Sequence, residues 1–148
     1  MARRPPGTRA EYRAFVPLQT RWADNDAYGH MNNATYFSLF DTAVSYWQIG
    51  AGLALTGPGA FRVVIAESGC TYHAELCFPQ PLTAGLRVGH LGNSAYRIEV
   101  GLFAGNNQTA GAEGFFVQVH VDDQHRPAPL PDGPRAALAA LLVQGPAA

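Results

Sequence analysis

A short polar stretch at residues 24–33 gathers several side chains that could do chemistry, immediately before a strongly apolar segment. Charge is otherwise scarce, since only 14% of the residues are charged. The polar side chains of the stretch are Asp24, Asn25, Asp26, His30, Asn32 and Asn33. A carboxylate held in such a place can attack a carbonyl carbon or activate a water molecule. We therefore take residues 24–33 as the candidate reaction site.

The apolar segment that follows is predicted to be a helix, and the start of a helix has chemical properties of its own. Asn32 or Asn33 can cap it, and apolar residues then recur at spacings of three and four up to Ile49. The first helical turn presents backbone N–H groups without intrahelical partners, and these can stabilise an oxyanion. A thioester is a suitable target, because its thiolate leaves readily and one carboxylate with an oxyanion hole is sufficient.

The rest of the chain is predicted to supply strands that surround this helix. Apolar and polar residues alternate from Tyr12 to Trp22, which is typical of a half-buried strand. Further strand-like segments lie near residues 61–78, 85–92, 95–104 and 109–121. Because the helix is apolar on more than one face, we expect it to be enclosed. The order of elements predicts an α+β domain in which one antiparallel sheet is wrapped around one long central helix.

A single domain is expected over residues 1–148, because nothing in the composition marks a second one. Residues 1–11 are predicted to be a flexible arm, since the Arg, Pro and Gly at their start have little to bury. Residues 133–148 follow a proline-rich segment and are predicted to form a tail helix.

Charge and cysteine spacing argue against several classes of protein. A net charge of −1 gives no overall field for nucleic acid or an anionic membrane. Cys70 and Cys77 lack the spacing of metal or redox motifs, which favours free thiols in a reducing compartment. No apolar run approaches the roughly 18–20 residues that span a bilayer, and the first residues lack an apolar signal core. We expect a cytoplasmic protein with no metal ion, no cofactor and no membrane insertion.

Residues 21–43, RWADNDAYGHMNNATYFSLFDTA, resemble the signature of the 4-hydroxybenzoyl-CoA thioesterase-like branch of the hotdog superfamily. The resemblance extends over most of the chain after residue 12. It implies a hotdog fold and an enzyme that hydrolyses an acyl-CoA thioester to a free acid and CoA. It also implies a homodimer or homotetramer with each active site at a subunit interface.

The same resemblance assigns roles to individual residues. The catalytic carboxylate falls at Asp26, as general base or as nucleophile through an anhydride, although an aspartate here could also simply cap a turn. Asn33 falls where the family offers a backbone N–H to the thioester oxygen. His30 could position water, contact the thioester or brace the loop. The candidate substrate-contacting residues are Tyr28, Asn32, Tyr36, Glu67 and Ser94, for each of which an ordinary structural role is the alternative.

Two other functions remain open from the sequence. One is a non-catalytic module that binds an acyl-CoA or an acyl-carrier protein. The other is a hotdog hydratase or dehydratase, which would pair a histidine and an acid across the double bond of an enoyl thioester. The length of the acyl chain, the choice of CoA over carrier protein, and the choice of dimer over tetramer are not determined by the sequence.

Overall fold

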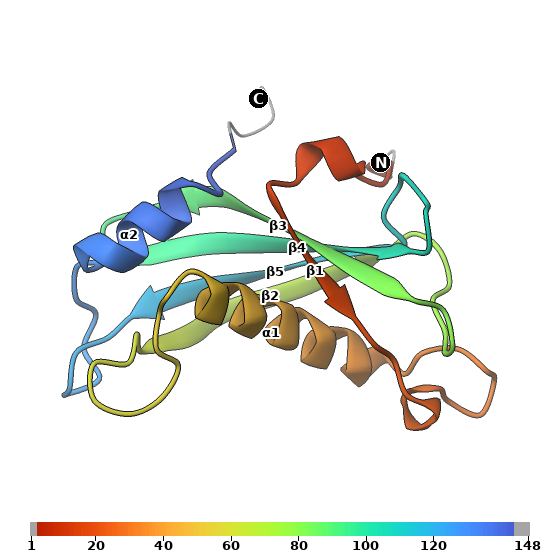
Figure 1. Cartoon of the computed structure of the whole chain (residues 1–148), viewed down its shortest axis with the longest axis horizontal. Coiled ribbons are helices and arrows are strands. Elements are labelled where there is room, and N and C mark those ends of the chain that lie inside the picture. The colour runs from red at the N-terminus through yellow and green to blue at the C-terminus, as the bar shows by residue number, and fades with distance from the viewer. Residues whose placement is uncertain (1–2, 144–148) are drawn as a thin grey trace.

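Five antiparallel strands form one sheet, and its concave face holds a long helix (Figure 1). This computed structural model describes residues 3–143. The strand order is β1-β3-β4-β5-β2. The elements are β1 (Ala14–Leu18), α1 (Asn33–Gly50), β2 (Val63–Tyr72), β3 (Leu82–Leu91), β4 (Ala95–Ala104), β5 (Ala112–His120) and α2 (Asp132–Ala139). The predicted α+β hotdog architecture is thereby confirmed.

Helix α1 begins where the sequence predicts and packs on the sheet through one face. The Asn32 side chain caps it by accepting a hydrogen bond from the Ala34 N–H at 2.9 Å. Phe40 is fully buried between α1 and the sheet. Its ring lies so close to Gly114 of β5 that a Cβ on that residue would overlap it. Tyr46 and Ile49 are each 58% exposed. The expectation that α1 is enclosed therefore fails within one chain, because the sheet covers only one side of it.

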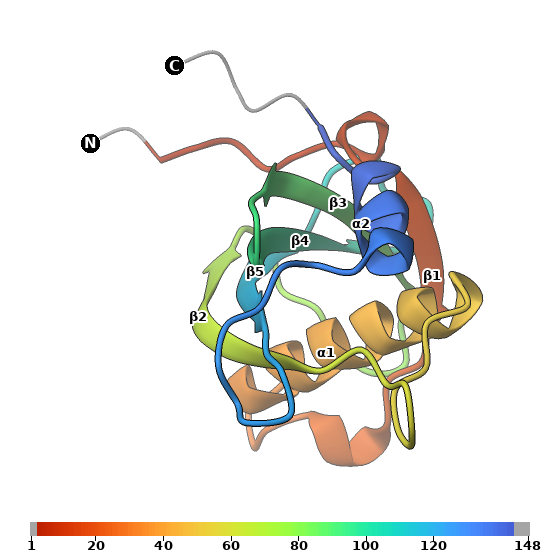
Figure 2. The same cartoon turned by 90° about the vertical axis from the view of Figure 1, so that its left-hand side faces the viewer.

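The two faces of the sheet have different characters. Residues that alternate along the central strands, such as Leu86, Val88, Ile98 and Val100, are fully buried between the sheet and α1. The intervening residues face the convex side, which Figure 2 shows curving away from α1. There Arg87 lies directly across from Glu99. The convex face is thus partly charged, whereas the concave face is apolar.

Three predicted strands differ from the observed ones mainly at their ends. Strand β1 stops at Leu18 instead of continuing to Trp22, because Trp22–Asp24 form a short 3-10 helix, η2. Strand β2 stops at Tyr72 instead of continuing to residue 78. Strand β3 starts at Leu82, three residues earlier than predicted. These ends lie around the polar stretch at residues 24–33.

Both terminal segments lie against the sheet. The Gly7 N–H donates to the Glu113 carboxylate at 2.8 Å, and Arg9–Glu11 form a short 3-10 helix, η1. Residues 7–11 are therefore held by the sheet, unlike the loose arm that the sequence predicts. The predicted tail helix begins as α2, after which Leu142 pairs beside Val88 of β3. Residues 1–2 and 144–148 of these two predictions lie outside the described residues. No helix within residues 3–143 has the length and apolar character needed to cross a bilayer.

Candidate active site

Asp26 lies in a tight turn that fixes one of its carboxylate oxygens. Its Oδ1 accepts hydrogen bonds from the backbone N–H of Tyr28 at 2.8 Å and of His30 at 3.2 Å. Its own N–H donates to the His30 carbonyl at 2.6 Å, and Gly29 completes the turn with φ of +81°. Within residues 3–143 no hydrogen bond is made by Oδ2. Asp26 is exposed, so the turn orients one carboxylate oxygen and leaves the other without a hydrogen-bond partner among the described residues.

Asp24 differs sharply from Asp26, although only one residue separates them. It is 4% exposed, and both of its carboxylate oxygens are bound by Arg21. The Arg21 N–H reaches Oδ2 at 2.7 Å, while the guanidinium reaches Oδ1 at 2.8 Å. The hydrogen bond from Arg21 lowers the pKa of the Asp24 carboxyl. Asp24 is therefore a structural carboxylate that closes η2.

The N-terminus of α1 adjoins this turn and leaves a backbone donor available. The Asn32 N–H donates to the Asp24 carbonyl at 2.7 Å, which ties the start of the helix to the loop. The Asn33 N–H has no acceptor among the residues that the structure describes. The Asn33 side chain accepts a hydrogen bond from the Tyr72 phenol of β2. The Tyr72 ring packs edge-on against Tyr36, with 4.9 Å between the ring centroids.

Tyr72 and Glu75 are contacts that the sequence did not indicate. Glu75, three residues after the end of β2, pairs with His30, with 3.2 Å between His30 Nε2 and Glu75 Oε2. Both residues belong to a segment about 40 positions after the 24–33 stretch. The spacing of residues within that stretch therefore could not predict them. The one available hint is alternation along the strand, because Tyr72 lies two residues after Cys70 and so faces the same side of β2.

The structure places six of the predicted residues around one end of α1 and two elsewhere. Those brought together are Asp26, Tyr28, His30, Asn32, Asn33 and Tyr36. Glu67 is exposed on the convex side of edge strand β2, because it pairs with Val117 of β5. The Ser94 carbonyl accepts from the His120 N–H, at the opposite end of β2 from Tyr72. The length of β2 separates those ends, about 30 Å, so Ser94 does not reach Asp26 within one subunit.

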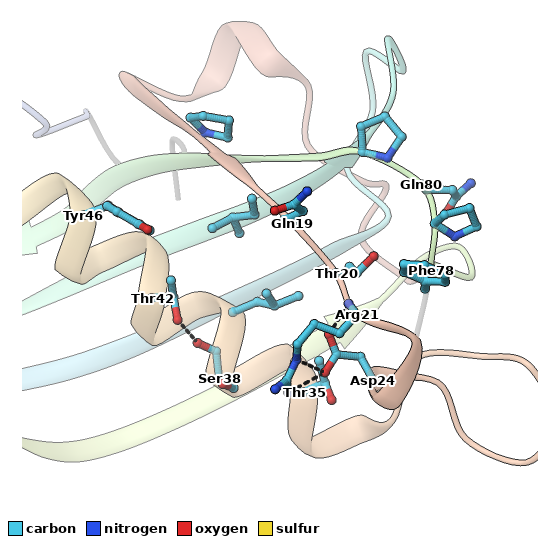
Figure 3. A pocket seen from close by; sticks show the side chains of 15 residues that line it. Gln19, Thr20, Arg21, Asp24, Thr35, Ser38, Thr42, Tyr46, Phe78 and Gln80 are labelled. Carbon is cyan, nitrogen blue, oxygen red and sulfur yellow. Dashed lines mark hydrogen bonds and ion pairs between the residues drawn. The ribbon is translucent and has the colours of Figure 1, made fainter.

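A groove of about 820 Å³ follows the other side of α1, next to β1 (Figure 3). Its helical wall carries the side chains of Thr35, Ser38, Thr42 and Tyr46, and its far wall includes Gln19, Thr20, Arg21, Phe78 and Gln80. Asp24 lines it, whereas Asp26 does not. Leu18, Leu39, Phe78 and three prolines line it beside the hydroxyl, amide and guanidinium groups, so its lining is mixed. The groove therefore does not by itself mark the thioester site.

Edge strand β2 leaves apolar side chains uncovered near its start, at the end away from the Asp26 turn. Ile65 is 49% exposed and Val64 is 44% exposed, and β2 pairs with β5 on one side only. An edge strand presents unpaired backbone groups, and an apolar one is a common site of association. Tyr72 is at the other end of the same strand, so a partner that covers the whole length of β2 also lies next to the site.

Comparison with known proteins supports one family. The family model of the thioesterase-like superfamily matches residues 20–138. No curated protein matches the chain significantly. Among solved structures, the PA5185 protein of Pseudomonas aeruginosa strain PAO1 is 42% identical, with a TM-score of 0.90, and the match covers 96% of this chain and 100% of that one.

Two further solved structures are similar to this chain. The PA2801 protein of Pseudomonas aeruginosa, a putative thioesterase, is 32% identical over 85% of this chain and 98% of that one, with a TM-score of 0.78. A thioesterase from Thermus thermophilus, complexed with coenzyme A and Zn, is 28% identical. That match covers 88% of this chain and 95% of the other, with a TM-score of 0.71. The chain belongs to the thioesterase-like superfamily and is a thioester hydrolase.

Proposed function

We propose that this protein is an acyl-CoA thioesterase that uses Asp26 as its catalytic carboxylate. The observation that carries the proposal is the geometry of Asp26, whose Oδ1 is held by two backbone N–H groups while Oδ2 is left unbound by the described residues. A carboxylate oriented in this way, at the N-terminus of a helix, can act on a carbonyl with little reorganisation. The CoA complex of the Thermus thermophilus thioesterase supports CoA as the thiol portion of the substrate.

In the reaction we propose, the thioester oxygen lies at the first turn of α1 and accepts a hydrogen bond from the Asn33 N–H. Asp26 Oδ2 then either takes a proton from an attacking water or attacks the carbonyl carbon itself. In the first route the tetrahedral intermediate collapses, the C–S bond breaks, and the CoA thiolate receives the proton. In the second route the tetrahedral adduct of Asp26 collapses, the C–S bond breaks, and the thiolate leaves and takes a proton from solvent. The mixed anhydride of the acyl group and Asp26 that remains is then hydrolysed by water. Mass spectrometry of the protein after turnover with hydroxylamine distinguishes the two, because only the anhydride route can leave a hydroxamate on the Asp26 side chain.

His30 contributes to this site mainly by bracing the loop. Its backbone N–H and carbonyl both bond to Asp26, and its ring is already paired with Glu75. A ring held by Glu75 is less available for a thioester than the oxygen of Asp26. We therefore assign His30 to positioning, and Tyr28 likewise acts through its backbone N–H. Asn32 caps α1, and Tyr36 packs against Tyr72.

The working unit we propose is a homodimer in which two β2 edges pair and two sheets become continuous. The exposed Val64 and Ile65 side chains support pairing of the β2 edges. Pairing along the whole strand would also bring the Tyr72 end of β2, and with it the Asp26 turn, to the subunit interface. Solution mass measurement tests it with Ile65→Lys, which we expect to be monomeric and nearly inactive. Phe15→Lys, on the opposite edge strand β1, is the matched control and keeps the dimer. A monomeric but fully active wild type would contradict the shared site.

The function itself is tested by thiol release from short, long and aromatic acyl-CoAs with the purified protein. We expect turnover of at least one substrate, with free acid and CoA as the only products. Tight binding of acyl-CoA without turnover would instead favour a non-catalytic binding module. Addition of water to an enoyl-CoA, without release of thiol, would favour a hydratase. The acyl-CoA that turns over fastest then fixes the acyl preference.

A further inference from the structure

A second groove, of about 830 Å³, lies on the convex face of the sheet, away from α1. Its walls are the segment before β1, strands β3 and β4, and the segment after α2, and Figure 2 shows both terminal segments on this side of the sheet. Four of the chain's ten basic residues line it: Arg4, Arg13, Arg87 and Arg97. Only Glu11 and Glu99 oppose them among its lining residues. The groove therefore carries a formal charge of +2 in a chain whose net charge is −1.

Two of these arginines are held in place by one carboxylate. Arg87 Nε lies 2.7 Å from Glu99 Oε1, and Arg97 Nε lies 2.7 Å from Glu99 Oε2. The Arg97 guanidinium also stacks over the Phe115 ring, 3.6 Å from its centroid. Both guanidiniums are thereby fixed side by side, although they carry the same charge. A pair held in this way loses little side-chain entropy when it binds a ligand.

Arg87 and Arg97 differ in how many of their guanidinium nitrogens remain available to a ligand. The Arg87 side chain is 8% exposed and also reaches the Glu11 carbonyl at 3.3 Å. The Arg97 side chain is 39% exposed, and within residues 3–143 its only hydrogen bond uses Nε. The terminal nitrogens of Arg97 therefore remain available as donors at the groove. The Arg13 side chain makes, among residues 3–143, only a long hydrogen bond of 3.4 Å to the Ala10 carbonyl.

A glycine in the floor makes this arrangement possible. A Cβ on Gly89 would lie 2.9 Å from Glu99 Oε2, which is shorter than a van der Waals contact between carbon and oxygen. Gly89 therefore leaves the space that the Glu99 carboxylate occupies between the two arginines. Residues that alternate with this floor, such as Val88 and Val100, belong to the core on the α1 side. The groove and the Asp26 turn are thus on opposite faces of the same sheet.

We propose that this groove binds a phosphate-bearing small molecule, whose anionic oxygens contact Arg97, Arg13 and Arg4. Planar guanidiniums donate two parallel hydrogen bonds to phosphate oxygens, so they suit this class of ligand. The volume is within the usual range of small-molecule sites. The charge excess attracts an anion that the rest of this acidic chain does not. Phosphate binding at these arginines does not depend on the reaction at Asp26.

The test is calorimetric titration of the full chain with inorganic pyrophosphate and with ADP. We expect saturable binding that Arg97→Gln weakens about tenfold or more, the size of one lost charge-assisted hydrogen bond. Arg97→Lys keeps the charge but loses the fork, and we expect an intermediate loss. Arg62→Gln removes the same charge from an exposed residue outside this groove, so we expect less than about a twofold change. No saturable binding, or equal weakening by Arg62→Gln, would overturn the proposal.

A second arm distinguishes a free phosphate ligand from the nucleotide end of CoA. Coenzyme A is titrated with and without saturating pyrophosphate. Unchanged CoA affinity shows that the groove takes a separate ligand, as its position behind the sheet predicts. Competition that depends on Arg97 shows that the groove takes the CoA phosphates of a neighbouring subunit. Either result is compatible with a phosphate site in the groove. Both titrations measure binding and not turnover, so they do not depend on whether Asp26 is catalytic.

Discussion

The Tyr72 phenol, on edge strand β2, donates a hydrogen bond to the side-chain oxygen of Asn33, the first residue of α1. This bond joins the edge of the sheet to the helical turn that carries the proposed oxyanion donor. The pKa of Tyr72 is raised to about 12, chiefly by burial and further by the neighbouring Cys70. Tyr72 therefore stays protonated, and able to donate, throughout the neutral range.

Replacing Tyr72 by phenylalanine removes that hydrogen bond and keeps the ring that packs on Tyr36. We expect kcat to fall by about tenfold, which is the worth of one hydrogen bond, while KM changes little. The effect should be smaller when Asn33→Ala is already present, because both changes remove the same contact. Tyr46→Phe, at an exposed position of α1, is the control. Fully additive losses would show that Tyr72 does not act through Asn33.

The proposed role of the Asn33 backbone is tested by comparing Asn33→Ala with Asn33→Pro. Proline is well tolerated at the first position of a helix, and Asn32 already has an extended backbone (φ −58°, ψ 139°) that can precede it. The alanine variant keeps the N–H, so we expect only a modest loss. The proline variant lacks it, and we expect kcat to fall by about 100-fold or more, as for other oxyanion donors. Equal activities, with matched melting temperatures, would place the oxyanion elsewhere.

Gly114 is predicted to be essential for packing rather than for chemistry. An added Cβ would overlap the Phe40 ring at the centre of the core. We expect Gly114→Ala to lower the free energy of unfolding by about 1–3 kcal/mol, as overpacking does elsewhere. Urea denaturation measures this directly. Gly133→Ala, where a Cβ meets nothing within 4 Å in α2, serves as the control and should be neutral or slightly stabilising.

The Arg87–Glu99–Arg97 cluster predicts how stability depends on pH. Burial raises the pKa of the Glu99 carboxyl, but hydrogen bonds from Arg97 and Arg87 outweigh it, and the pKa is lowered. The unfolded chain has an ordinary glutamate pKa of about 4.3. The ionised carboxylate therefore stabilises the fold above that pH, and this stabilisation is lost as pH falls through the lowered value. We expect Glu99→Gln to unfold more readily at neutral pH and to lose less stability on acidification. Parallel stability curves for both proteins from neutral pH to below the glutamate pKa would contradict this.

Much of the fold follows from local patterns. The spacing of apolar residues and the Asn cap predict α1 to within a residue, and alternation predicts the strands because it reports which face is buried. The confirmed family and hotdog fold follow from the signature around Asp26. Predictions fail where packing between distant segments decides. Gly7 binds Glu113 across 106 positions, and one chain leaves much of the outer side of α1 exposed.

The site is predicted less completely than the fold. Asp24 and Asp26 are the same residue type with one residue between them, and the contact with Arg21 separates a buried structural carboxylate from an exposed one. Tyr72 and Glu75 arrive from β2 and the turn after it, so no spacing near Asp26 indicates them. The catalytic and substrate-binding roles, together with the cytoplasmic location, stay predictions.

Catalysis by Asp26 is tested most directly by the kcat of Asp26→Asn beside that of the wild type, measured by thiol release from the best acyl-CoA. The amide keeps the size of the side chain and can still accept the hydrogen bonds from Tyr28 and His30. Asp123→Asn, at an exposed position paired with Arg62, is the control and should match the wild type. We predict a loss of about 100-fold or more for Asp26→Asn, the size expected when a general base is removed. Equal kcat for Asp26→Asn and the wild type would contradict catalysis by Asp26 and place the catalytic carboxylate elsewhere.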